Sequence, residues 1–136
     1  MTAEVIEFFI PAITTAKQST RFGKKRAYAD AKVSTNAEVL ASYAHPHIPA
    51  EPWKGAIKAT FRFEYEWRMK DNPATRAAGP LPKPTGPDND NLIKQMGDML
   101  QAMRFFKNDA QIAETHVYKH FTGNNGVHVR LEKLTQ

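Results

Sequence analysis

The stretch AIKATFRFEYEW, residues 56–67, decides the fold. Polar residues alternate along it with the apolar residues Ile57, Ala59, Phe61, Phe63, Tyr65 and Trp67. A period of two is that of a β-strand, whose successive side chains point to opposite faces of a sheet. We therefore expect a long strand with one face in a core. The other face mixes basic residues with two glutamates, which favours a core strand over a platform for stacking bases.

Three further strands are predicted from short apolar runs rich in Val, Ile and aromatic residues: 4–10, 111–120 and 127–133. The last two are separated by Thr-Gly-Asn-Asn-Gly at residues 122–126, a sequence typical of a β-hairpin. Together with 56–67, these runs predict a sheet of about four strands.

Two helices are expected. Residues 28–43 are rich in alanine and carry apolar residues at helical spacing. Residues 92–103 place Leu92, Ile93, Met96, Met99, Leu100 and Met103 on one side, which is the pattern of an amphipathic helix. Five of the nine prolines fall between 73 and 87, so that segment is expected to lack regular structure. The prediction is an α+β fold: a single two-layer domain spanning 1–136, with a mixed sheet packed against two helices.

The composition excludes several classes of protein. With 136 residues and no cysteine, the chain has neither disulfides nor thiolate chemistry. The first residues carry acid where a secretory signal carries base. No apolar run approaches the roughly 20 residues that cross a bilayer. We therefore expect a cytoplasmic protein.

The net charge of +5 is unevenly placed. Between Lys17 and Arg26 lie five basic residues and no acid, while the rest of the chain balances at 14 basic and 14 acidic residues. A concentrated positive segment favours a polyanionic partner. The alternative is an ordinary solvated loop.

Asp88 and Asp90 are the first candidate metal ligands. Two carboxylates one residue apart in extended chain lie on the same side, about 6 to 7 Å from each other, where they can flank a hard cation. The helix that follows them favours negative charge at its start. The alternative is helix capping, with Asp90 as the N-cap.

Lys94 and Asp98 continue the polar stripe from Asp90, each one turn after the last. Such a stripe is commonly a surface ion-pair ladder, but beside a metal site Lys94 is suited to a phosphate oxygen and Asp98 to holding that lysine. Asp109 is a third candidate carboxylate, which reaches Asp88 only if the next strand pairs beside the entry to the helix. A turn-forming aspartate is the alternative.

These residues resemble the RusA family of Holliday junction resolvases, small endodeoxyribonucleases common in phages. The resemblance rests on PDNDNLIK at 87–94 with Asp98, and on NDAQI at 108–112 with Lys119. The second block departs from the family's Asp-Asp-x-Gln-Val at Asn108 and Ile112.

The resemblance implies a set of roles. Asp88, Asp90 and Asp109 would bind the metal, Mg²⁺ with Mn²⁺ as an alternative, and Lys94 would be the catalytic lysine. Supporting roles would fall to Asn91, Asp98, Asn108 and Gln111. The expected substrate is a four-way DNA junction, cut by a homodimer through paired symmetrical nicks in recombination and repair, in a bacterium or a phage.

Phosphate contacts are expected from basic residues outside the carboxylate cluster: Lys17, Arg21, Lys24, Lys25, Arg26, Arg76 and Lys83, joined by Arg68 and Lys70. Two alternatives stay open. One is a nuclease for other branched DNA, such as flaps or forks. The other is a DNA-binding protein whose acidic cluster is structural and not catalytic.

Overall fold

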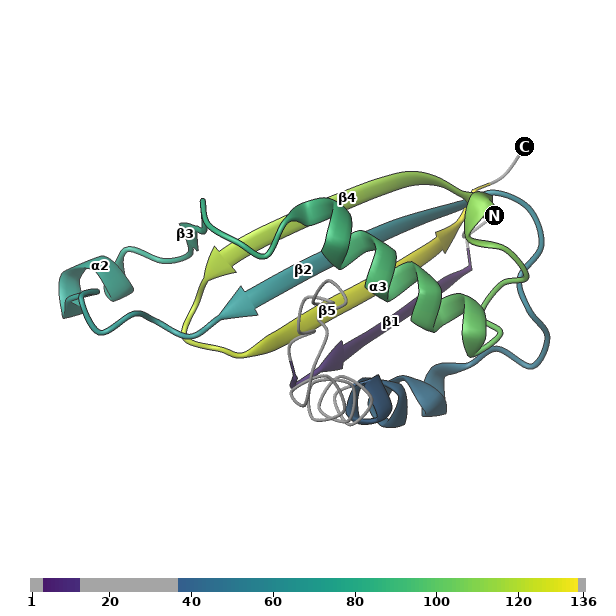
Figure 1. The fold of residues 1–136 in the computed structure, drawn as a ribbon, viewed down its shortest axis with the longest axis horizontal. Helices are drawn as coiled ribbons and strands as arrows, with labels where there is room; N and C mark the ends of the chain where they lie inside the picture. Colours follow the sequence, from purple (N-terminus) through teal and green to yellow (C-terminus); the bar gives the residue numbers. More distant parts are fainter. Residues whose placement is uncertain (1–3, 13–36, 135–136) are drawn as a thin grey trace, which may run out of the picture.

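The stretch at 56–67 forms the centre of the sheet. The structure is a computed structural model that describes residues 4–12 and 37–134. Its strands join in the order β1-β5-β2-β4-β3 (Figure 1). Their bounds are β1 Val5–Ile10, β2 Ile57–Tyr65, β3 Leu81–Pro82, β4 Ile112–Phe121 and β5 Gly126–Lys133. Because β2 pairs parallel with β4 and antiparallel with β5, the sheet is mixed, as predicted.

The alternating apolar residues of β2 lie in the hydrophobic core. Ile57, Ala59, Phe61 and Phe63 have no exposed surface. They share one hydrophobic cluster with Leu92, Met96 and Leu100 of helix α3 (Asn89–Ala102), which lies across the sheet in Figure 1. Each of these large side chains contributes about 1.5–3 kcal/mol by leaving water. The predicted core strand and amphipathic helix are both confirmed.

The predicted hairpin between the last two strands is wrong. β4 and β5 do not pair with each other, because β2 lies between them. The connection at 122–125 instead crosses the end of β2, where the N–H groups of Thr122 and Gly123 donate to the Tyr65 carbonyl at 3.0 and 3.3 Å. The turn residues do reverse the chain, but around a third strand.

The proline-rich segment is more regular than predicted. Pro73 begins a short helix, α2 (Pro73–Ala77), where the N–H that proline lacks has no helical partner in any case. Pro82 lies in the two-residue edge strand β3, which pairs with the end of β4. This strand raises the count in the sheet to five, against about four expected, and the α+β class is confirmed.

The first predicted helix is described in part. Residues 37–44 are helical and lead into the 3-10 helix η1 (His45–His47), whereas the predicted beginning, 28–36, lies outside the described residues. Leu40 and Ala44 are buried in the core. Within the described residues, no helix has the length and apolar character needed to cross a membrane.

Candidate active site

The first carboxylates lie at the beginning of α3. Asp88, and not Asp90, is the N-cap residue, and its side chain accepts no capping hydrogen bond. Asp90 lies in the first turn. Both are exposed at the end of the helix where backbone N–H groups and the helix dipole favour negative charge. The capping alternative for Asp90 is therefore wrong, since the helix begins before it.

An open pocket of about 520 Å³ runs between α3 and the start of β4. Its polar lining brings together four of the predicted residues, Asp90, Lys94, Asp98 and Asp109. Asp88 is not among the lining residues. Asp109 belongs to the short 3-10 helix η2 (Asp109–Gln111), which precedes β4 and returns the chain to α3.

The carboxylates are spread along this pocket. Asp90 and Asp98 are eight residues apart on α3, about 12 Å along its axis. Asp109 lies beside Gly97, because a Cβ placed on that glycine would be 3.9 Å from the Asp109 Cβ. Accordingly, no three His, Asp or Glu side chains of the described residues group closely enough to hold one ion. The oxygen donors nevertheless fit Mg²⁺, which commonly takes one or two carboxylates and completes its shell with water and substrate phosphate.

The carboxylates and the lysine in the pocket have no structural partners among the described residues. No side-chain hydrogen bond or ion pair there involves Asp90, Asp98, the Asp109 carboxylate or Lys94. The ion-pair ladder that the i,i+4 spacing favours is therefore not formed in this part of the chain. All four residues are exposed, so their charged groups face solvent and are accessible to a ligand.

A network of amide side chains fixes the turn that carries Asp109. Asn108 Oδ1 accepts from Ala110 N at 2.8 Å, and Gln111 Oε1 accepts from Asn108 N and Lys107 N at 3.1 Å. Gln111 Nε2 donates to the carbonyls of Trp53 and Gly55 at 2.9 and 3.0 Å. Asn108, which departs from the family's aspartate, thus acts here as a cap of η2.

Two lysines hold the loop that enters α3. Lys119 Nζ donates to the carbonyls of Thr85 and Pro87, and Lys83 Nζ donates to Thr85 Oγ1 and the Gly86 carbonyl, all at 2.7 Å. Burial lowers the pKa of Lys83, and the positive charges of Lys119 and Arg68 lower it further. The predicted DNA-binding residue Lys83 therefore has bonds within the protein.

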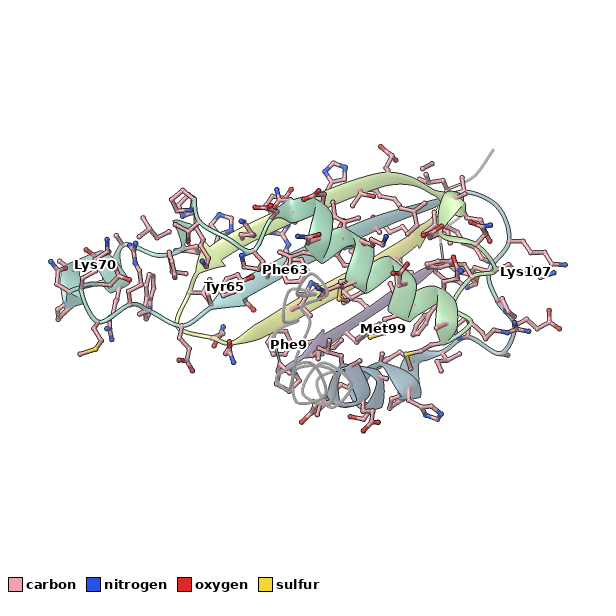
Figure 2. The ribbon with its side chains drawn as sticks, viewed as in Figure 1. Phe9, Phe63, Tyr65, Lys70, Met99 and Lys107 are labelled. Carbon is pink, nitrogen blue, oxygen red and sulfur yellow. The ribbon has the colours of Figure 1, made fainter. Side chains whose placement is uncertain are left out.

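The other predicted contacts in the described residues lie around α2. Arg68 Nη2 pairs with the buried Asp71 at 3.0 Å, and Arg76 Nε donates to the Asp71 carbonyl at 2.9 Å. The hydrogen bond from the Arg68 side chain lowers the pKa of Asp71. Figure 2 shows Lys70 at this end of the molecule, far from Lys107. The basic segment Lys17, Arg21, Lys24, Lys25 and Arg26 lies outside the described residues.

Four pocket residues were not anticipated from the sequence: Ile93, Gly97, Ile112 and Thr115. Gly97 gave a usable signal, because a glycine within a helical pattern commonly has a packing or functional reason. The remaining three are ordinary helix and strand residues, whose place in the pocket follows from how α3 lies against β4.

The chain also matches a known protein family. The family model described as endodeoxyribonuclease RusA matches residues 10–132, nearly the whole chain. No curated protein matches the sequence.

Proposed function

We infer the function from one premise: the chain belongs to the RusA family of endodeoxyribonucleases, which are Holliday junction resolvases. It is therefore an enzyme that cuts branched DNA. We propose further that it resolves four-way junctions by paired symmetrical nicks with Mg²⁺, and that Mn²⁺ can replace Mg²⁺. The observation that carries the proposal is the pocket that Asp90, Lys94, Asp98 and Asp109 line together.

In this proposal, metal binding falls to Asp88, Asp90 and Asp109, one or two of which would hold an ion while water and substrate phosphate complete its shell. The bound ion would activate water and offset charge on the scissile phosphate. Two features support the proposal: Asp88 and Asp90 lie at the positive end of α3, and Asp90 and Asp109 line one pocket.

Lys94 would donate to a non-bridging phosphate oxygen, because it lies between Asp90 and Asp98 on the wall of the pocket. Asp98 would orient that lysine once DNA is bound. Asn91, Asn108 and Gln111 would support the site. For Asn108 and Gln111 the bonds that fix η2 favour this role.

Substrate binding would rest on two groups of basic residues in the sequence. Lys17, Arg21, Lys24, Lys25 and Arg26 form the densest group, and Arg76 and Lys83 come from the segment between β2 and α3. Phosphate contacts of this kind read the shape of a junction and not its bases.

Two opposed strands require two sites, which a homodimer of this one-domain chain supplies. A nuclease acting on cellular or phage DNA would work in the bacterial cytoplasm.

The test incubates the protein with a synthetic four-way junction and a linear duplex of the same sequence, with and without Mg²⁺. We expect Mg²⁺-dependent, paired nicks in the junction alone, and loss of cleavage in Asp90→Asn. Equal cleavage of the linear duplex would refute junction selectivity. Faster cleavage of flaps or forks would favour the related branched-DNA nuclease, and binding without cleavage would favour the non-catalytic alternative.

A further inference from the structure

Lys119 is a residue that the proposed catalytic roles leave unused. It lies on β4 opposite Phe63 of β2, so its side chain shares the sheet face that packs against α3. Its ammonium donates at 2.7 Å to the Thr85 carbonyl and at 2.7 Å to the Pro87 carbonyl. A single side chain from the sheet thus joins two peptide groups of the loop that leads into α3.

The second of these carbonyls is next to the candidate site. The Pro87 carbonyl belongs to the peptide that joins Pro87 to Asp88, and a hydrogen bond to it restrains the plane of that peptide. No regular secondary structure includes residues 83–88. The direction in which the chain presents Asp88 is therefore set from one side by side-chain bonds of this type and from the other by α3, where the Leu92 N–H donates to the Asp88 carbonyl at 3.1 Å.

Lys83 supports the same loop from the other side. Its ammonium donates to Thr85 Oγ1 and to the Gly86 carbonyl, while its backbone N–H donates to the Lys119 carbonyl at 2.9 Å. Four bonds from two cations thus converge on residues 85–87. Hydrogen bonds from charged donors are shorter and stronger than those between neutral groups.

We propose that Lys119 is a positioning residue, which clamps the loop at 85–87 and thereby sets Asp88 for metal binding. The proposal rests on the proposed function. Two of the three N–H donors of the ammonium already have protein partners, so a direct phosphate contact would have to use the remaining one. The clamp and the phosphate contact predict different results when the lysine is removed.

The test replaces the ammonium in Lys119→Met and uses Lys58→Met as the matched control. Lys58 is adjacent along β2 to Ala59 of the core face, so its side chain lies on the opposite face of the sheet from α3. Backbone order parameters from NMR relaxation, measured without metal or DNA, should fall at Thr85, Gly86 and Asp88 in Lys119→Met and stay unchanged elsewhere. Unchanged order parameters at these three residues would overturn the clamp.

Function is measured in parallel. At saturating junction with Mg²⁺, Lys119→Met should cut at least 10-fold more slowly. Without divalent metal, where the proposed chemistry cannot proceed, its junction Kd and salt dependence should equal those of wild type. A weaker Kd with a salt slope reduced by about 0.9 would identify a phosphate contact and overturn the positioning role.

Two safeguards keep the result decisive. If Lys119→Met does not fold, Lys83→Met removes two bonds to the same loop and must lower the order parameters of the same residues. If wild type leaves the four-way junction uncut, the proposed function fails, whereas the order parameters still decide whether Lys119 clamps the loop.

Discussion

Replacing Gln111 tests the structural support of Asp109 most sharply. Gln111→Met keeps the length of the side chain but removes four hydrogen bonds, two accepted from Lys107 and Asn108 and two donated to the carbonyls of Trp53 and Gly55. At about 0.5–1.5 kcal/mol each, with three of the four near solvent, the expected loss is about 2 kcal/mol. For a chain of this size that lowers Tm by roughly 6–10 °C.

The measurement is urea unfolding followed by circular dichroism, with Gln95→Met as the matched control. Gln95 Nε2 is buried without a hydrogen-bond partner among the described residues, so the same exchange there should leave stability unchanged or raise it. If the free energy of unfolding of Gln111→Met lies within 0.5 kcal/mol of that of wild type, the amide network does not hold η2.

Three further predictions concern other parts of the molecule. Gly126→Ala should lower the free energy of unfolding in urea by about 1–3 kcal/mol, because the added Cβ would collide with the Ile10 carbonyl oxygen. A variant as stable as wild type would refute the packing of β1 against β5 at this position. The hydrogen bond from the Arg68 side chain lowers the pKa of Asp71 in the folded protein, so the stability that this carboxylate contributes is complete well above its unfolded pKa and is lost as pH falls through the folded pKa. Asp71→Asn should flatten the fall of the unfolding free energy at acid pH, measured in urea, and a fall identical to that of wild type would contradict the pairing. Lys94→Gln should slow cleavage of saturating junction about 100-fold, as for loss of a positioned donor to developing charge, and should weaken the junction Kd because a phosphate contact is lost; a normal cleavage rate would exclude its catalytic role.

Much of the fold was predictable because its signals are local. The alternation in β2 and the apolar side of α3 specify their own buried faces, and the core in which Phe61 and Leu92 meet follows from them. The hairpin was mispredicted because residues 122–126 look alike whether the flanking strands pair directly or enclose a third strand. The two arrangements differ only in whether β2 pairs with β4 on one edge and with β5 on the other. This pairing joins residues more than 50 positions apart in the sequence.

The candidate site was predictable in its residues but not in its arrangement. The spacing of Asp90, Lys94 and Asp98 placed them on one face of a helix, and the structure finds them along one pocket. The position of Asp109 beside Gly97 depends on how the turn after α3 folds back. The contacts of Lys119 join residues 32 and 34 positions apart, beyond the reach of any local pattern.

The central claim is that the carboxylates of the pocket bind the catalytic metal, and Mn²⁺ binding followed by electron paramagnetic resonance tests it most directly. We predict that Asp90→Asn and Asp109→Asn each weaken Mn²⁺ binding at least 10-fold, and that each loses junction cleavage in Mg²⁺. Glu114→Gln should match wild type in both assays, because Glu114 is next to Thr115 of the pocket on β4 and faces the other side of the sheet. Wild-type Mn²⁺ affinity and normal junction cleavage in both aspartate variants would contradict the account.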